Sequence, residues 1–374
     1  MRGLPWGGSE YLWSRAAHRL LKRGHVVSVS YKHWPDGAPA PLRRLREAGA
    51  RVRRYERYPL LARAWRRGRR VLRRRAGITA PSLHQRWLRR EQPGLVLVSM
   101  GNLRSRLDLA EACRRRDVPY ALLVHVANWA RWLEGAATVA RYRRAFREAE
   151  ACFFVSAENR EIAEANLGAA LPHASVVDNP LWKPDAPLPW PSSEENWRLA
   201  CVGRLHFRQK AQDVILRVLR REKWRSRPLQ MRFYGEDHGD EARLRKQIRR
   251  RGLEQQVQLA GYADREHIWR TCHGLLVPSR YEGMPMVTPE AMACGRVPVV
   301  TRCGRNPDLV ADGDIGFLAE AATERLVDRA LERAWQRRSE WKKMGRRAAQ
   351  HIREDYEDDP PGAFAQKLLE CVPA

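Results

Sequence analysis

Two pairs of charged residues in the second half of the chain have the types and the spacing to do chemistry. Glu282 and Glu290 lie eight positions apart in the segment RYEGMPMVTPEAM, while Arg204 and Lys210 follow the apolar run WRLACVG. Two cations at the end of a strand and close to helix N-termini suit a pyrophosphate, because the charge on such a leaving group must be neutralised as the bond to it breaks. These residues predict a site for an anionic ligand.

The elements around the two glutamates predict one βαβ unit. The residues at 275–278 and 297–301 are apolar strand candidates, and a short helix is expected from Thr288 to about residue 294. Such a unit places the loop after its first strand at the carboxyl edge of a parallel sheet, where open α/β folds bind ligands. Thr288 is a candidate N-cap with Pro289 at the first helical position. On this evidence alone, Glu290 is explained as a first-turn acid that complements the helix dipole, which is the role of most such glutamates.

Strands and helices alternate along the rest of the chain, which predicts α/β parallel sheets covered on both faces. The other strand candidates are residues 25–30, 94–100, 119–125, 151–156, 175–178, 197–203, 229–235 and 257–261. Prolines crowd residues 179–191, as in a rigid linker. We therefore expect two Rossmann-like domains that face one another: residues 1–180 on the acceptor side, residues 192–345 on the donor side, and a helical segment at 346–374 that packs back toward the first domain.

Two features of the first half are weaker candidates for the site. Gly7 and Gly8 precede a helical pattern and could form an anion-binding turn, although two glycines alone are a weak signal. His125 ends a predicted strand at the carboxyl edge, with Asn128 just after it. A lone histidine is more often structural than functional, so both interpretations of His125 remain open at this point.

Composition adds a strong positive charge and excludes several classes of protein. The 374 residues carry a formal net charge of +27 and seven cysteines that are scattered singly, which fits neither a disulfide framework nor a structural zinc site. The Asp312–Gly313–Asp314 triplet lies in a glycine turn, so we expect no metal and no other cofactor. Since no apolar run approaches the roughly 18 residues of a membrane span and no signal segment opens the chain, we expect a cytoplasmic protein.

Much of the charge is clustered between Arg51 and Arg75. This stretch contains twelve arginines against one glutamate, with aromatic and aliphatic residues between them. A basic amphipathic surface of this kind fits nucleic acid or an anionic membrane face. A genome that places arginine on every solvated face explains the cluster equally well.

The second half resembles the retaining glycosyltransferases of family four, the glycosyl transferases group 1, which have the GT-B fold. The resemblance rests on VGRLHFRQKAQDVIL, MRFYGEDHG, VQLAGY, CGRNPDLV and above all PSRYEGMPMVTPEAMACGRVPVV, whose two glutamates have the spacing Glu-x7-Glu. It is strong over residues 197–318. PWGGSEYLWSRAAHRLLKRGHVVSVS is similar to the family's opening glycine turn, helix and second strand.

The resemblance implies a role for each candidate residue. Arg204 and Lys210 would hold the diphosphate of a nucleotide-sugar, and Glu282 would contact the donor sugar near the reacting centre. Glu290 would accept hydrogen bonds from the ribose hydroxyls. The backbone of the loop residues Gly283, Met284, Met286 and Val287 would contact the sugar and the phosphates. Gly7 and Gly8 would contact the phosphates, and His125 would lie beside the sugar and the acceptor.

The resemblance also implies a reaction and its partners. A sugar would pass from the nucleotide-diphosphate donor to a hydroxyl of a glycan or lipid-linked acceptor, with retention at the anomeric carbon and without a metal, in cell-surface polysaccharide or lipopolysaccharide synthesis. The basic cluster would dock this hexosyltransferase peripherally on the inner face of the membrane. Two alternatives are a basic nucleic-acid-binding protein, for which no sequence-reading element is recognisable, and an inactive scaffold, which the presence of all four charged residues disfavours.

The chain departs from the family pattern in two places. Asp308 stands where members usually carry glutamate, and Arg305 with Asn306 replaces a second glycine. No residues before Gly7 can form the first strand of the first domain, which is central in a doubly wound sheet. We therefore expect that the start codon has been placed too late and that the natural chain has a short strand before Arg2.

Overall fold

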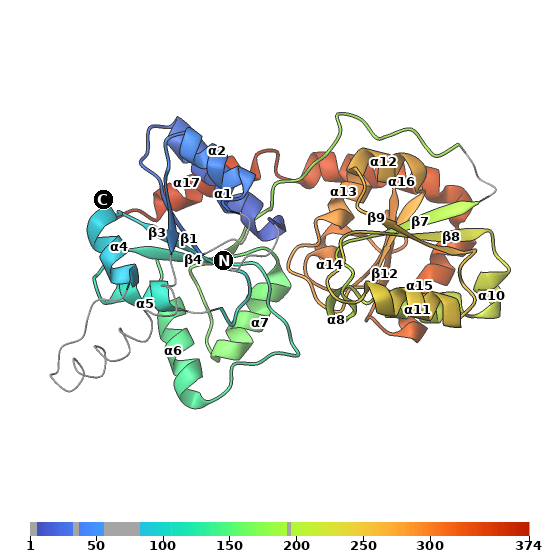
Figure 1. The fold of residues 1–374 in the computed structure, drawn as a ribbon, viewed down its shortest axis with the longest axis horizontal. Helices are drawn as coiled ribbons and strands as arrows, with labels where there is room; N and C mark the ends of the chain where they lie inside the picture. Colours follow the sequence, from blue (N-terminus) through green and yellow to red (C-terminus); the bar gives the residue numbers. More distant parts are fainter. Residues whose placement is uncertain (1–5, 33–36, 56–82, 106, 193–195, 374) are drawn as a thin grey trace. The chain divides into compact units, whose positions relative to one another are not determined.

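The chain folds into two compact units, each built on parallel β-strands (Figure 1). The structure, a computed structural model, describes residues 6–32, 37–55, 83–105, 107–192 and 196–373. Unit 1 comprises Met1–Phe154, Arg160–Pro180 and Asp359–Ala374, and unit 2 comprises Val155–Asn159 and Leu181–Asp358. Parallel pairing with helical crossovers confirms the α/β class expected from the sequence.

Unit 2 contains a six-stranded parallel sheet in the order β12-β11-β10-β7-β8-β9. Its strands are β7 (Trp197–Val202), β8 (Leu229–Tyr234), β9 (Val257–Gly261), β10 (Gly274–Val277), β11 (Val297–Thr301) and β12 (Phe317–Ala319). Every residue of β10, β11 and β12 is buried, as expected for strands that have helices on both faces. The order turns back between β7 and β10, because β8 and β9 extend the sheet one way and β10 to β12 the other. Ligands bind at such a switch point in doubly wound folds.

Helices cover both faces of the unit 2 sheet. Figure 1 shows α12, α13 and α16 along one face and α11 and α15 along the other. The helices are α8 (Phe207–Lys210), α9 (Gln212–Leu219), α10 (Glu222–Arg225), α11 (Glu241–Arg250), α12 (Arg265–Thr271), α13 (Val287–Ala293), α14 (Asn306–Leu309), α15 (Glu324–Gln336) and α16 (Trp341–Asp355).

In unit 1 the described strands form two separate parallel sheets. A two-stranded sheet pairs β1 (Ser28–Lys32) with β2 (Arg51–Tyr55). A four-stranded sheet has the order β3 (Val96–Met100), β4 (Tyr120–Val124), β5 (Ala151–Phe154) and β6 (Ala174–Val176). Within the described residues, neither β1 nor β3 pairs with a second strand on its other edge. Residues 1–5, before the first helix, lie outside the described residues.

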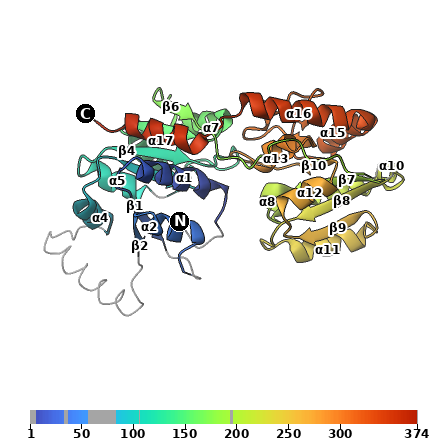
Figure 2. The ribbon, with the colours of Figure 1, turned by 90° about the horizontal axis from the view of Figure 1, so that it is seen from above.

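The helices of unit 1 include segments from both ends of the described chain. They are α1 (Gly8–Lys22), α2 (Ala40–Glu47), α4 (Leu83–Glu91), α5 (Asp108–Arg114), α6 (Ala136–Arg147), most of α7 (Ala157–Leu167) and α17 (Pro360–Glu370). Figures 1 and 2 show α17 alongside α1, where Arg19 pairs with Asp359 at 3.1 Å. Phe153 of β5 packs edge-on against Phe364, which fixes α17 to the sheet.

One sequence-based expectation was wrong in detail, and two features of the later chain had no counterpart among the expectations. Phe317–Ala319 forms β12 at the sheet edge. Two helices, α15 and α16, follow it, with a 3₁₀ turn at Arg338–Glu340 between them. Helix α13 begins at Val287, one residue before Thr288, so Thr288 is not the N-cap; its buried hydroxyl donates to Oδ1 of Asn306 at 2.8 Å.

The proline-rich residues 179–191 form no helix or strand, and the part of this segment in unit 2 is bonded to a buried arginine. Arg296 is only 1% exposed, and its guanidinium donates to the carbonyl oxygens of Leu188 and Pro189. It also donates to the carbonyl of Trp269 and stacks over the ring of Trp190. Burial is the main cause that lowers the pKa of this guanidinium, to about 10. Arg353 also donates to the carbonyl of Pro184, so buried and half-buried arginines together hold the linker in place.

Candidate active site

The structure brings Lys210 and Glu282 into direct contact at the carboxyl edge of the unit 2 sheet. Lys210 ends α8, which follows β7, and Glu282 lies in the loop that follows β10. The Lys210 Nζ lies 2.6 Å from Glu282 Oε1, and the two side chains are 13% and 7% exposed. Since β7 and β10 are hydrogen-bonded neighbours in the sheet, their following loops meet. A cation and an acid from segments 72 residues apart thus share one buried position.

Two polar residues complete the surroundings of the Glu282 carboxylate. Ser279 Oγ donates to Glu282 Oε1 at 2.7 Å, and Gln209 Nε2 donates to Glu282 Oε2 at 3.3 Å. Gln209 in turn accepts from the guanidinium of Arg204 at 3.3 Å. Lys210, Ser279, Gln209 and Arg204 therefore form one hydrogen-bonded network with Glu282. This network compensates the buried charge of the Glu282 carboxylate and holds that group in one orientation.

A backbone contact sets the distance between the two loops. The amide of Arg280 donates to the carbonyl of Gln209 at 2.7 Å, and the Arg280 guanidinium pairs with the Asp213 carboxylate at 3.0 Å. Ala211, which follows Lys210, is a buried non-glycine residue at φ 53°. Strain of this kind is of order 1–3 kcal/mol and persists where surrounding structure fixes it. The backbone on both sides of Lys210 is therefore held in a fixed conformation by its surroundings.

Glycines let the strand ends approach each other closely. A Cβ on Gly235 would lie 2.1 Å from the carbonyl oxygen of Gly203, and one on Gly304 would lie 2.2 Å from that of Gly283. Gly203 and Gly235 also have φ values of 147° and 145°, which other residues rarely adopt. A Cβ on Gly203 would meet Lys210 Cε at 3.1 Å, so this glycine leaves room for the lysine side chain.

The end of β8 adds further polar groups to the same edge. The amide of Leu205 donates to the carbonyl of Glu236 at 2.9 Å, so the loops after β7 and β8 run together. Burial, and then the charge of Arg204, lower the pKa of His238. A positively charged guanidinium close to an imidazole and two strand ends is suited to an anion that carries more than one negative charge.

Glu290 lies inside the first turns of α13 and is largely cut off from solvent. Its carboxylate pairs with Arg265 of α12 at 3.3 Å, and burial raises its pKa to about 7 while Arg265 opposes that shift. The arginine side chain is 48% exposed and the glutamate side chain is 9% exposed. A carboxylate paired with one half-exposed arginine keeps lone pairs for the hydroxyl groups of a ligand.

The loop between Glu282 and Glu290 is supported from behind by Tyr356, at the end of α16. Tyr356 is buried and its hydroxyl lies 3.6 Å from the sulfur of Met284. Burial raises the Tyr356 pKa, and it lowers that of nearby Arg305 and raises that of Asp308. Met284 and Val287 are buried as well, so the backbone of this loop is packed in place.

Sequence reasoning missed Gln209, Ser279, Arg265 and Tyr356. The first two sit one and three positions from residues that were singled out, so proximity to a strand end was the available signal. Arg265 and Tyr356 come from other helices, and no spacing in the sequence connects them to Glu290 or Met284. Only the packing of α12 and α16 on this unit brings them to the site.

Gly7 and Gly8 lie at the start of α1 in unit 1. Gly7 is the N-cap of that helix, and its amide donates to the Glu10 carboxylate at 3.0 Å. Burial raises the Glu10 pKa despite hydrogen bonds from Ser9 and Gly7. The first amide of this turn is therefore already satisfied by a carboxylate from the helix itself.

His125 immediately follows β4 in unit 1 and is 4% exposed. Its Nε2 lies 3.1 Å from the hydroxyl of Ser99, at the neighbouring strand β3, and its amide donates to the carbonyl of Met100 at 3.0 Å. Burial lowers its pKa to about 4. The imidazole is therefore neutral near pH 7 and is held against the carboxyl end of the β3–β4 pair.

The part of the chain that the structure describes contains no group of three His, Cys, Asp or Glu side chains arranged for a metal ion. In the Asp312–Gly313–Asp314 turn, Asp312 pairs with Arg333 at 2.9 Å and Asp314 pairs with Arg347 at 2.8 Å. Both acids are thus engaged by arginines. Nor, over the same described ranges, is any helix long and apolar enough to cross a membrane.

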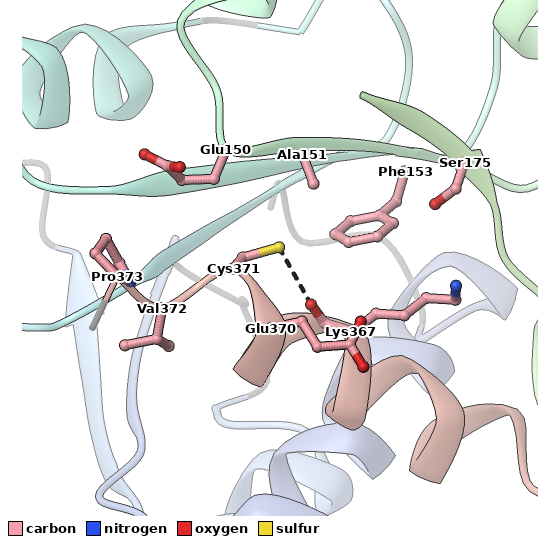
Figure 3. Close-up of a pocket in the computed structure, with 9 residues that line it drawn as sticks. All are labelled: Glu150, Ala151, Phe153, Ser175, Lys367, Glu370, Cys371, Val372 and Pro373. Atoms are coloured by element: carbon pink, nitrogen blue, oxygen red, sulfur yellow. Dashed lines mark hydrogen bonds between the residues drawn. The ribbon is translucent and has the colours of Figure 1, made fainter. Parts of the chain in front are cut away.

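A separate pocket in unit 1 lies between β5, β6 and the end of α17 (Figure 3). Ala151 and Phe153 line one side, and Lys367, Glu370 and Cys371 line the other. The Cys371 thiol donates to the carbonyl of Lys367 at 3.1 Å, which is the dashed line in Figure 3. Glu150 and Ala151 mark the amino end of β5, so this pocket is not at the ligand-binding carboxyl edge.

A family match includes the segment that carries this candidate site. Residues 196–336, less than half of the chain, match the family described as Glycosyl transferases group 1. A segment of 51 residues is 49% identical to the uncharacterized glycosyltransferase MJ1178 of Methanocaldococcus jannaschii. That segment is 14% of this chain and 14% of the relative, so the match spans a small part of either protein.

Solved structures resemble the whole chain in fold. Anabaena Alr3699/HepE, crystallised with UDP, has a TM-score of 0.75 at 16% identity, over 99% of this chain and 98% of that one. The lipopolysaccharide outer core galactosyltransferase WaaB has a TM-score of 0.71 at 20% identity, over 99% and 97% of the two chains. The domain match and these neighbours together support a glycosyltransferase with the GT-B fold.

Proposed function

We propose that the chain transfers a sugar from a nucleotide-diphosphate sugar to an acceptor hydroxyl, with retention at the anomeric carbon and without a metal ion. The observation that carries this proposal is the buried Lys210–Glu282 pair at the carboxyl edge of β7 and β10, inside the segment that matches the group 1 family. The UDP-bound structure of HepE, which shares the fold, makes a uridine nucleotide the first donor to test.

The residues have separable roles in this mechanism. The Lys210 ammonium and the Arg204 guanidinium neutralise the diphosphate, whose negative charge grows as the bond to the anomeric carbon breaks. Glu282 is oriented by Ser279 and Gln209 and contacts the donor sugar at that centre. Glu290 accepts hydrogen bonds from the ribose hydroxyls, and its ionised form is the stronger acceptor.

The test is incubation of the purified chain with a panel of UDP-, GDP- and ADP-sugars. We expect thermal stabilisation by one nucleotide class and slow release of the sugar from its donor. NMR of the first-formed sugar product distinguishes retention from inversion, and activity in excess EDTA tests metal independence. A protein indifferent to every nucleotide would not be a glycosyltransferase of this kind. Retained configuration and EDTA resistance test the two finer parts of the proposal separately.

The acceptor we propose is a cell-surface glycan or its lipid-linked precursor, reached at an anionic membrane by the basic stretch from Arg51 to Arg75. Of this stretch the structure describes only β2, whose Arg51 and Arg53 pair with Glu91 at 3.6 and 3.8 Å. Flotation with anionic and with neutral liposomes tests the membrane part. Binding to DNA that is lost in moderate salt would reflect the net charge of +27 alone.

A further inference from the structure

The loop between β4 and α6 in unit 1 displays two large apolar side chains in solvent. Trp129 and Trp132 are 42% and 47% exposed, and their ring centroids lie 6.0 Å apart at an interplanar angle of 51°. Single exposed hydrophobic residues are ordinary, whereas neighbouring aromatic rings on one surface commonly mark a binding site. Neither ring contributes to the network around Lys210 and Glu282, which belongs to unit 2.

This loop is held in a defined conformation. Asn128 Oδ1 accepts from the amide of Ala130 at 2.8 Å, and the Asn128 carbonyl accepts from that of Arg131 at 3.0 Å. The next anchor is Leu133, which is buried and donates its amide to Asn166 Oδ1 at 2.9 Å. Tight turns and buried anchors on both sides mean that the two tryptophans are presented by a preorganised loop, which lowers the cost of binding.

The two tryptophans also follow the carboxyl end of a strand, and charged residues lie close to them in the sequence. Their loop leaves the carboxyl end of β4 just after His125, where α/β folds place ligands. Arg104, from the loop after β3, lies 3.9 Å from Glu134, and Arg131, which lies between the two tryptophans in the sequence, is exposed. The two tryptophans are thus on a segment that also carries the charged residues Arg131 and Glu134, and apolar rings together with polar groups suit an amphipathic small ligand.

We propose that Trp129 and Trp132 form a stacking platform for a pyranose ring of the acceptor glycan. The proposal rests on the glycosyltransferase function proposed above. A pyranose has an apolar C–H face and a rim of hydroxyls, which complement an indole face and the donors and acceptors of Arg104, Arg131 and Glu134. An anionic membrane surface, which would meet the exposed Glu134 carboxylate as well as Arg131, is the competing occupant that the vesicles test.

The experiment uses the full chain labelled with 5-fluorotryptophan and observed by fluorine NMR. Trp129→Phe and Trp132→Phe assign the two signals. The probes are methyl α-D-glucopyranoside, methyl β-D-galactopyranoside, lactose and, separately, phosphatidylglycerol vesicles. We expect both signals to shift saturably with at least one saccharide. Trp129→Ala and Trp132→Ala should each weaken that binding about tenfold, as truncation of a central aromatic contact does. Tyr262→Ala removes an 83% exposed aromatic residue of unit 2 and should leave saccharide binding unchanged.

Two outcomes would overturn the platform: no shift with any saccharide, or shifts with the vesicles alone. Thermal stabilisation by UDP-sugar should be the same in both tryptophan-to-alanine variants as in the unmodified chain. If the protein binds UDP-sugar but no saccharide shifts either tryptophan signal, the stacking platform is contradicted. The proposed glycosyltransferase function is not contradicted by that result. One that binds saccharides at these rings but no nucleotide contradicts the proposed function instead.

Discussion

Lys210 Nζ lies 2.6 Å from Oε1 of Glu282, and both side chains are almost wholly removed from solvent. The ammonium that we assign to the donor diphosphate is therefore paired with the acid that we assign to the donor sugar. Removing one partner of a buried ion pair leaves the other charge uncompensated, which is far more costly than breaking an exposed pair. The residues that we propose for donor binding therefore also stabilise the unit that carries them.

Lys210→Ala should lower the free energy of unfolding by about 3–5 kcal/mol, since it leaves the buried Glu282 carboxylate without its charge partner. The matched control is Arg245→Ala, which breaks a pair with Glu241 that is 54% and 33% exposed. That control should cost about 0.3–0.5 kcal/mol, as helical i,i+4 pairs do. Urea denaturation measures both, and equal losses in the two variants would contradict the buried-pair account.

Gly235→Ala should destabilise unit 2 and weaken nucleotide binding together. The new Cβ would meet the Gly203 carbonyl oxygen at 2.1 Å, so the backbone beside Arg204 must move. Gly239→Ala is the control, because Gly239 also has a positive φ of 99° but has no atom within 4 Å of the added Cβ. We expect about 1 kcal/mol for Gly239→Ala and a larger loss for Gly235→Ala, with weaker UDP binding by calorimetry only in the latter. Unchanged binding in Gly235→Ala would separate this glycine from the site.

The raised pKa of Glu290 makes a prediction about pH. Its folded-state pKa of about 7 lies above the ordinary value of 4.5, so the folded chain holds this proton more tightly than the unfolded chain. The penalty of ionising Glu290 is absent below pH 4.5 and is complete above about pH 7, where it is at most about 3 kcal/mol. Glu290→Gln should therefore flatten the fall in stability across this window, measured by urea denaturation at several pH values.

Donor binding should have the opposite dependence on pH in the same window. If ionised Glu290 accepts hydrogen bonds from the ribose, nucleotide affinity rises as pH increases through about 7. Calorimetric titration with UDP between pH 5.5 and 8 measures this, and Glu290→Gln should remove the rise. An affinity in the unmodified chain that is flat over this range would argue against the ribose contact.

His125 predicts a second pH effect with the reverse sign for stability. Burial lowers its pKa to about 4 from 6.5, so the unfolded chain binds this proton more readily between those values. Its stabilising contribution is full above pH 6.5 and is lost as pH falls toward 4. His125→Gln should reduce the slope of stability against pH between 4 and 6.5. A slope identical to that of the unmodified chain would show that this histidine is not the group that titrates.

The sequence predicted the strands best where apolar residues run continuously. β10 and β11 are buried along their whole length, and their apolar runs begin and end within a residue or so of the observed strands. β2 was missed because its only buried side chain among the described ones is Val52, while its arginines face solvent. β12 is three residues long, too short for any periodic pattern. β2 and β12 are strands because they pair with neighbouring strands in the folded chain, and local sequence patterns do not report such pairing.

The candidate site was predictable to the extent that it follows strand ends. Lys210 and Glu282 both lie just after apolar runs, and the structure joins them directly. Thr288 carried a capping signal, yet its hydroxyl is taken by Asn306, from a segment eighteen positions away. Tyr356 and Arg265 reach the site from helices whose own patterns say nothing of a ligand. Their contribution depends on how α12 and α16 pack, which residue spacing does not encode.

The most direct test compares nucleotide binding and sugar transfer in Glu282→Gln and Glu290→Gln, with the donor that the panel identifies. We predict that Glu282→Gln binds the nucleotide with nearly unchanged affinity but no longer releases or transfers the sugar. Glu290→Gln should instead weaken binding by about 1.5–3 kcal/mol, the contribution of a hydrogen bond to a charged group. Equal losses of binding and of transfer in both variants would contradict the roles assigned to the two glutamates.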